Sequence, residues 1–348
     1  MKNYIDMANR LDLKRIETDK KRIEKLQAEG KYPLYFSMPT TIQYELTGDC
    51  NLKCAHCYNR SGDSDVVRNA KMTPEDWKTL SRQIVKDGGV FQCILSGGEP
   101  LLMGKHLYEI MDILSDDGTS FILITNGLLL NKETVEKLAK YRYYWFQISI
   151  DGSTPELHDS FRGVKNSWSR AVQGAMDIAD KNIRLTIAHT VTPQNLDYLP
   201  DMVELAYKIG ASSIEVGEVL PSGRAASNED IILTVEQRNL MLKMISELSL
   251  EYEGTMQIER SMNVTLSMKK YVTTPNNGCI IRPNGDVRLD CMAPFVIGNV
   301  LKDPFKKIWI EKGINAWKNE RVLKFIDSID AVSQKGDIPN HVYQDVYL

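Results

Sequence analysis

The chain has 348 residues, of which 43% are hydrophobic and 26% are charged, and its formal net charge at pH 7 is −3. A chain of this length and composition can build one large α/β domain with a smaller appendage. The near-neutral charge, without a strongly basic stripe, argues against nucleic acid as a partner. The first residues lack the apolar run of a signal peptide, and no stretch approaches the roughly 20 apolar residues of a membrane span. We therefore expect a cytoplasmic protein with no nucleic-acid or membrane partner.

The first 40 residues predict an N-terminal helical extension. Residues 11–27 combine many charges with a thin apolar stripe that includes Leu13 and Ile16. This pattern favours a solvated helix lying on the main domain. Pro33 and Pro39 interrupt it before the next element begins.

Strand and helix patterns alternate from residue 41 to about residue 232. Such alternation implies a parallel sheet with right-handed crossovers, and parallel barrels place their active sites at the carboxyl ends of the strands. We count six β-then-α units, which predicts a partly open barrel, with a full eight-stranded barrel as the alternative. The predicted strands cover residues 41–47, 90–96, 120–125, 143–150, 184–191 and 213–219, and the helices begin near residues 73, 104, 131, 167, 196 and 234.

Three of the six cysteines lie within eight positions, directly after the first predicted strand. Cys50, Cys54 and Cys57 suit metal ligation in a reducing compartment better than a disulfide framework. Three thiolates leave one position of an iron–sulfur cube open, and an open position is typical of a catalytic metal site. A zinc site completed by His56 and a chance grouping of core cysteines are the alternatives.

The spacing CxxxCxxC, followed by Tyr58, resembles the signature of the radical SAM enzymes, and the six-unit pattern resembles their (β/α)6 partial TIM barrel. The resemblance implies that Cys50, Cys54 and Cys57 hold a [4Fe–4S] cluster whose free iron binds S-adenosylmethionine (SAM). In that family one electron from the cluster cleaves SAM to a 5′-deoxyadenosyl radical, while the protein orients the cofactor. An external one-electron reductant of the flavodoxin or ferredoxin type is implied as a partner.

The resemblance also implies residues that bind SAM. Consecutive glycines at a strand end let the backbone approach a ligand closely. The GGE motif binds the SAM amino group in that family, which points to Gly97, Gly98 and Glu99. Turn formation by Asn-Gly and Asp-Gly pairs, structural arginines and core packing are the alternative explanations of the other candidates. These further candidates for the ribose, the carboxylate or the adenine are Asn126, Ser149, Asp151, Arg162, Val216 and Arg224.

The alternation stops after a helix over about residues 234–251. Residues 276–300 predict a β-hairpin with Cys279 and Cys291 near its outer ends, and a short helix follows over 303–309. This order of features resembles the start of the SPASM or twitch extension. In those radical SAM enzymes the extension carries auxiliary iron–sulfur clusters, and many members modify peptides.

No cysteine follows Cys291, so the extension falls short of the four thiolates of a closed cluster. An auxiliary cluster would need other ligands, such as Asp290 or Cys93, although Cys93 is more simply a buried hydrophobic residue. Alternatively the hairpin has lost its cluster, and Cys279 or Cys291 is free to act as a hydrogen donor.

Four segments are expected: an N-terminal helical extension (1–40), a radical SAM partial barrel (41–232), a connecting helical segment (233–275) and a SPASM/twitch-like region (276–348). The predicted function is hydrogen abstraction from a ribosomally made peptide, giving epimerisation or cross-linking. The few spare thiolates favour epimerisation, in which a thiol returns a hydrogen. A radical SAM oxidoreductase of a tetrapyrrole or sugar is the first alternative, and a non-catalytic iron–sulfur or zinc protein is the second.

Overall fold

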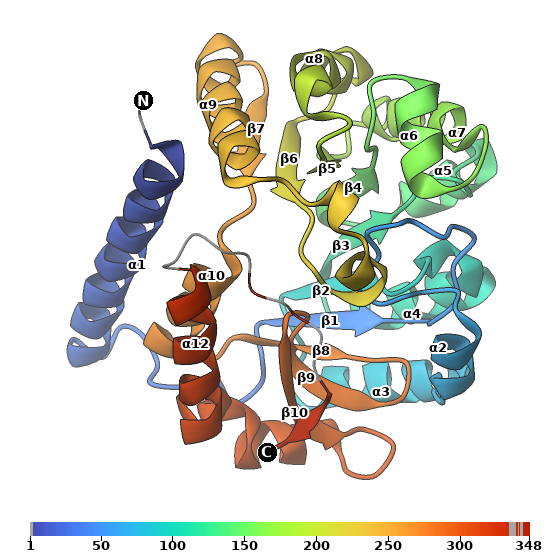
Figure 1. Ribbon diagram of the computed structural model, residues 1–348. Helices are drawn as coiled ribbons and strands as arrows, with labels where there is room; N and C mark the ends of the chain where they lie inside the picture. The colour runs from blue at the N-terminus through green and yellow to red at the C-terminus, as the bar shows by residue number, and fades with distance from the viewer. Residues whose placement is uncertain (1–2, 334–338, 340, 342–343) are drawn as a thin grey trace.

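The computed structural model describes residues 3–333, 339, 341 and 344–348 of this protein. In that part of the chain eleven strands form one sheet, in the order β11-β10-β9-β8-β1-β2-β3-β4-β5-β6-β7 (Figure 1). The strands are β1 (Thr41–Glu45), β2 (Gln92–Ser96), β3 (Ser120–Thr125), β4 (Tyr143–Ser149), β5 (Leu185–Val191), β6 (Ser213–Glu218), β7 (Gln257–Arg260), β8 (Gly278–Ile281), β9 (Asp286–Asp290), β10 (Ala293–Asn299) and β11 (Val346–Tyr347).

Strands β1 to β6 pair in chain order, and every pair is parallel. Helices connect them on the outer side of the curved sheet, as right-handed βαβ crossovers require (Figure 1). This arrangement confirms the predicted partial barrel. The helices from the barrel are α3 (Pro74–Lys86), α4 (Lys105–Ser115), α5 (Lys132–Leu138), α6 (Pro155–Arg162), α7 (Ser167–Ala179), α8 (Leu199–Ile209) and α9 (Val235–Glu251), with the short α2 (Ser64–Asn69) before them.

Helix α3 shows how local sequence positions an element of the barrel. Thr73 and Asp76 form a capping box, and Pro74 occupies the first turn, where its missing N–H costs nothing. The buried face includes Trp77, whose ring lies 4.8 Å from the ring of Tyr44 on β1. Its Nε1 donates to the carbonyl of Leu46 at 3.1 Å. The helix therefore fixes the carboxyl end of β1, from which the cysteine loop leaves.

Helix α1 (Tyr4–Ala28) is longer than predicted, and one residue of its predicted apolar stripe is exposed. It begins at Tyr4 because the side chain of Asn3 accepts from a backbone N–H of the first turn. It contacts α9 and α10 (Val264–Thr273), and Asp12 forms an ion pair with Arg260 of β7 at 2.8 Å. Leu13, placed in the apolar stripe by the sequence pattern, is 41% exposed.

The C-terminal segment extends the barrel sheet on the side of β1. Strand β8 pairs parallel with β1, and β9 and β10 follow antiparallel, so the predicted hairpin adds directly to the barrel's edge (Figure 1). Strand β7, which the sequence did not predict, adds to the opposite edge beside β6. Helices α11 (Phe305–Glu311) and α12 (Glu320–Ser333) follow. None of the helices in the described residues is long and apolar enough to cross a membrane.

Candidate functional site

The loop after β1 carries the three clustered cysteines at the carboxyl edge of the sheet. All three are free thiols, with Cys54 buried and Cys50 and Cys57 half-buried. Leu52, Leu128 and neighbouring apolar side chains pack around the sulfur atoms. The loop therefore holds three sulfur donors together in a partly apolar setting.

Two side chains from elsewhere in the barrel, one after β3 and one at the end of α6, reach these sulfur atoms. Asn126, after β3, directs its Nδ2 toward Cys50 Sγ at 3.9 Å, and Arg162 donates from a terminal nitrogen to Cys54 Sγ at 3.6 Å. Burial raises the pKa of Cys50 to about 11, and it also raises the pKa of Cys54, although the Arg162 charge opposes the rise. Donors of this kind favour a thiolate over a thiol, as metal ligation requires.

Gly97 and Gly98 let two backbone segments approach each other. A Cβ on Gly98 would stand 1.7 Å from the carbonyl oxygen of Asp49, and Gly97 has a φ of +129°. Their neighbour Glu99 is fully buried, and its carboxylate accepts from Thr125 Oγ1 at 2.7 Å and from two backbone N–H groups. The GGE segment, which follows β2, therefore contacts both the end of β3 and the cysteine loop. Its role in binding SAM stays a prediction.

Asp151 forms a buried ion pair that the sequence did not predict. Its carboxylate, with no exposed surface, lies 2.6 Å from Nε of Arg162 on α6. Burial alone would raise the pKa of Asp151, but Arg162 and three neighbouring imidazoles hold that pKa well below its ordinary value. Arg162 also donates to Cys54. The contacts of Arg162 with Asp151 and Cys54 therefore connect the end of β4 to the cysteine loop. Asp151 has no exposed surface here, and its role in binding SAM stays a prediction.

Three of the five histidines of the chain gather around that ion pair. His158 of α6 and His189 of β5 are buried, and each has a ring nitrogen without a hydrogen-bond partner in the described part of the chain. Burial lowers the pKa of His158 to about 4, so its imidazole is neutral at pH 7. The third, His56, stacks on Phe161 of α6 with 4.4 Å between the ring centroids.

Arg224 also contacts the cysteine loop, through hydrogen bonds to its backbone and an ion pair. Its Nε donates to the carbonyl of Cys54 at 2.9 Å, and a terminal nitrogen pairs with Asp63 at 2.9 Å. The preceding Gly223 packs so closely that a Cβ would stand 2.3 Å from the carbonyl oxygen of Cys57. Arg224 is therefore occupied by the loop itself.

The last two predicted SAM residues lie apart from the sulfur atoms. Ser149 ends β4, where it is half-buried and pairs in register with Ala188 of β5. Val216 of β6 is 1% exposed and lines a cavity of about 230 Å³ between β6, α1, α9 and α10. Val216 therefore packs in the hydrophobic core and also lines this cavity.

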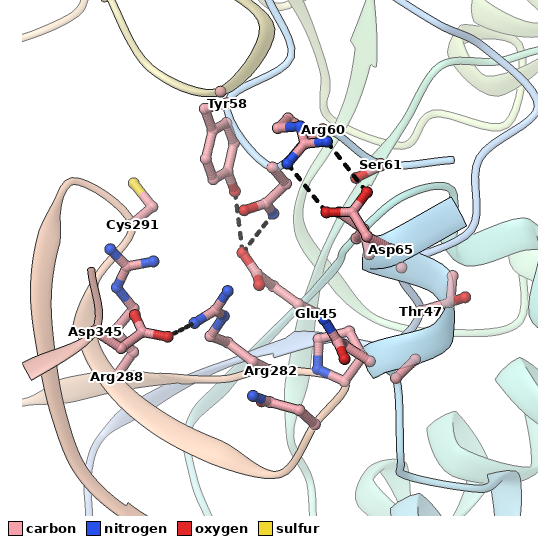
Figure 2. A pocket seen from close by; sticks show the side chains of 18 of the residues that line it. Glu45, Thr47, Tyr58, Arg60, Ser61, Asp65, Arg282, Arg288, Cys291 and Asp345 are labelled. Atoms are coloured by element: carbon pink, nitrogen blue, oxygen red, sulfur yellow. Dashed lines mark hydrogen bonds and ion pairs between the residues drawn. The ribbon is translucent and has the colours of Figure 1, made fainter. Parts of the chain in front are cut away.

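A second cavity of about 370 Å³ opens between the cysteine loop and the C-terminal hairpin (Figure 2). Cys291, just after β9, lies at its hairpin end, and Glu45 and Tyr58 lie opposite (Figure 2). Tyr58 Oη donates to Glu45 Oε1 at 3.1 Å. Burial, Asp290 and Glu45 all raise the pKa of Cys291, so its sulfur carries a proton at neutral pH. Sequence reasoning missed Glu45 because it reads as one of the polar residues of an ordinary alternating strand.

The structure does not bring Cys279 and Cys291 together. Cys279 on β8 is in register with Ile42 of β1 and therefore shares the face on which Tyr44 points toward the helices. It is 5% exposed in the main hydrophobic core, which also contains Cys93. Cys291 instead faces the cavity beside Glu45, on the opposite face of β1 (Figure 2). The two thiols therefore lack the shared face that joint ligation of a cluster needs.

Three thiolates on one loop suit an iron–sulfur cluster, which spreads its ligands over separate iron atoms and leaves one iron open when only three are supplied. The zinc alternative would need the imidazole of His56 beside the sulfur atoms. His56 instead stacks on Phe161 of α6.

The sequence profile of the radical SAM superfamily matches residues 44–206, which run from β1 into α8. The PqqA peptide cyclase of Rhizobium meliloti is 30% identical over 292 residues, covering 81% of this chain and 76% of that protein. This chain belongs to the radical SAM superfamily. An AdoMet-dependent heme synthase of Methanosarcina barkeri is 29% identical over 290 residues, covering 78% of this chain and 82% of its own.

Solved structures show the same fold. Streptococcus suis SuiB bound to S-adenosylmethionine superposes with a TM-score of 0.65 at 17% sequence identity, over 94% of this radical SAM chain and 80% of SuiB. With its hairpin extension and its peptide-modifying relatives, the chain falls in the SPASM/twitch-type subgroup. It is a radical SAM enzyme whose cofactors are a [4Fe–4S] cluster and SAM.

Proposed function

We propose that this radical SAM enzyme modifies a ribosomally made peptide, and that the modification is epimerisation at a carbon next to Cys291. The observation that carries the proposal is the position of the Cys291 thiol, which lines the cavity between the cysteine loop and the hairpin. The name of the PqqA peptide cyclase supports a peptide as substrate.

In this proposal Cys50, Cys54 and Cys57 hold the cluster, and the side chains around them keep the loop in place. When bound, the cluster and SAM supply a 5′-deoxyadenosyl radical that takes one hydrogen atom from the substrate. Arg162 and Asn126 stabilise the thiolates by donating toward Sγ of Cys54 and Cys50. Of the other predicted SAM residues, Arg224 holds the cysteine loop. We propose that the rest bind SAM: Gly97, Gly98, Glu99, Ser149, Asp151 and Val216.

Cys291 returns the hydrogen atom. Its S–H bond breaks as a new C–H bond forms on the substrate carbon, from the face opposite to the abstraction. One electron from an external reductant of the flavodoxin or ferredoxin class, with one proton from solvent, restores the thiol. A neutral thiol suits this step because a thiolate has no hydrogen atom to give, and the raised pKa of Cys291 keeps it neutral.

Oxidation of a tetrapyrrole is the second candidate, because heme synthases are as similar to this chain as peptide maturases are. The half-open cavity of about 370 Å³ accepts part of either substrate. Net oxidation leaves an electron for an auxiliary cluster to accept, and Cys279 and Cys291 are not placed to hold one jointly. This separation favours the redox-neutral reaction, epimerisation.

The test begins with anaerobic reconstitution of the wild type, a Cys50/Cys54/Cys57→Ala triple variant and a matched Cys291→Ala control. We expect the triple variant to lose about four irons per chain and all production of 5′-deoxyadenosine after dithionite reduction. We expect Cys291→Ala to keep both. Loss of iron in Cys291→Ala would make that residue a cluster ligand and overturn its role as hydrogen donor.

The second stage uses a peptide that the wild type modifies, incubated with the enzyme in deuterium oxide. Each epimerised residue should gain one deuterium at Cα, and Cys291→Ala should give no deuterated product. A wild-type product without deuterium at Cα would exclude epimerisation by an exchangeable thiol.

A further inference from the structure

Three arginines line the 370 Å³ cavity, and two of them are paired with carboxylates. Arg60 contacts Asp65 with both terminal nitrogens at 3.1 Å, and Arg282 contacts Asp345 at 2.7 Å (Figure 2). These two cations are neutralised locally, so they attract a ligand anion only weakly.

Arg288 is different. Its Nε donates to the carbonyl of Ala293 at 2.7 Å, which fixes the side chain in the hairpin, and it makes no ion pair with any carboxylate of the described residues. The nearby Asp290 carboxylate accepts from the Met292 N–H at 2.8 Å and lies 3.8 Å from Cys291 Sγ. The terminal nitrogens of Arg288 are therefore left for the cavity.

The position of Arg288 places its charge beside Cys291 at the hairpin end of the cavity, where it also acts on the Asp290 carboxylate without a direct ion pair (Figure 2). The carboxylate of Glu45 across the cavity already accepts from Tyr58 Oη and from Asn59 Nδ2 at 2.9 Å. A guanidinium presents a planar fork of donors that matches a carboxylate in two parallel hydrogen bonds.

We propose that Arg288 binds a carboxylate of the substrate, so that the molecule reaching Cys291 carries an acidic group close to its reacting carbon. The inference rests on the proposed function in placing the substrate in this cavity. The carboxylate comes either from an acidic residue or C-terminus of a peptide, or from a propionate of a tetrapyrrole.

The test compares two alkylating probes on the reconstituted holoenzyme. Iodoacetate carries a carboxylate and iodoacetamide does not, while both form the same S–C bond with Cys291 and release iodide. The rate of alkylation of Cys291 by each probe is followed by mass spectrometry of the peptide that contains it. Both probes react with the same thiolate, so the thiolate fraction cancels in the ratio of the two rates. A change in this ratio between variants therefore reports the attraction of the carboxylate. We expect Arg288→Gln to lower the iodoacetate-to-iodoacetamide ratio about fivefold, the upper range for a partly exposed ion pair.

Two matched variants separate this effect from a general change in charge. Arg288→Lys should keep most of the ratio, because it keeps the charge. Arg282→Gln, which removes a cation already paired with Asp345, should leave the ratio nearly unchanged. An unchanged ratio in Arg288→Gln, or an equal fall in Arg282→Gln, would overturn the proposal.

Protection experiments identify the source of the carboxylate. A peptide containing glutamate is compared with its glutamine twin, and a porphyrin with free propionates with its methyl ester, as inhibitors of Cys291 alkylation by iodoacetamide. In one of the two pairs, we expect the compound with the carboxylate to slow alkylation of the wild type but not of Arg288→Gln. The pair that shows this effect identifies the substrate carboxylate as that of a peptide or of a tetrapyrrole. If neither acid protects better than its neutral twin, the proposal is wrong. Since alkylation needs no SAM cleavage, failure of the radical reaction would leave these results readable.

Discussion

Replacing Asp151 with asparagine should destabilise the protein strongly, because it leaves Arg162 buried without its partner. The ion pair spans 2.6 Å between a carboxylate with no exposed surface and an arginine side chain that is 9% exposed. Breaking a buried pair of this kind by removing one member typically costs about 3–5 kcal/mol, since the remaining charge stays desolvated. We expect a loss in the free energy of unfolding near that range.

Urea unfolding of the cluster-free protein, followed by far-UV circular dichroism, measures this loss directly. Asp151→Glu serves as a control that keeps the charge. The double variant Asp151→Leu/Arg162→Met removes both charges and should be more stable than Asp151→Asn, because no unpaired ion remains. A loss below about 1 kcal/mol in Asp151→Asn, or a double variant less stable than the single one, would refute the reasoning.

The other predictions concern the cysteine loop and the buried histidines beside it. Gly98→Ala should cost about 1–3 kcal/mol and lower the iron content after reconstitution, because its Cβ would meet the Asp49 carbonyl at 1.7 Å; normal iron content would contradict this. Stability should fall as the pH drops below about 6.5, since the pKa of His158 is lowered to about 4 and its protonation favours the unfolded chain. Between about pH 6 and 4 the wild type should lose about 1.4 kcal/mol per pH unit more than His158→Gln; equal slopes would exclude this residue as the cause. Arg224→Ala should release the loop at Cys54 and slow cluster incorporation, measured by absorbance during reconstitution, whereas Arg224→Lys should recover part of the rate.

The order of the barrel elements could be predicted from the sequence because each strand is a short apolar or alternating run, and turn residues or helix caps separate it from the next element. Thr73, for example, forms the expected capping box at the start of α3. Strand β7 was missed because its four residues, Gln257–Arg260, contain three polar side chains and no alternation that a buried strand would show. Its place in the sheet is given by its pairing with β6 rather than by its own sequence.

The site was predicted only as far as neighbouring residues in the chain determine it. The cysteine spacing points to one loop, but the partners of Asp151 and Arg162 depend on how α6 packs against the strand ends. The separation of Cys279 from Cys291 depends on strand register, because a shift of one residue moves a side chain to the other face. Arg288 gave no signal in the sequence, where an arginine in a hairpin is most simply a surface residue.

Strand β1 is shared by two parts of the molecule, because it pairs with β2 on one side and with β8 on the other. A ligand that shifts the hairpin through Arg288 or Cys291 therefore pulls on the strand from which the cysteine loop leaves. A chain cut before residue 276 would leave the backbone of β1 unpaired along that side, as an open edge prone to join other chains. The C-terminal extension therefore supports the strand that carries the cysteine loop.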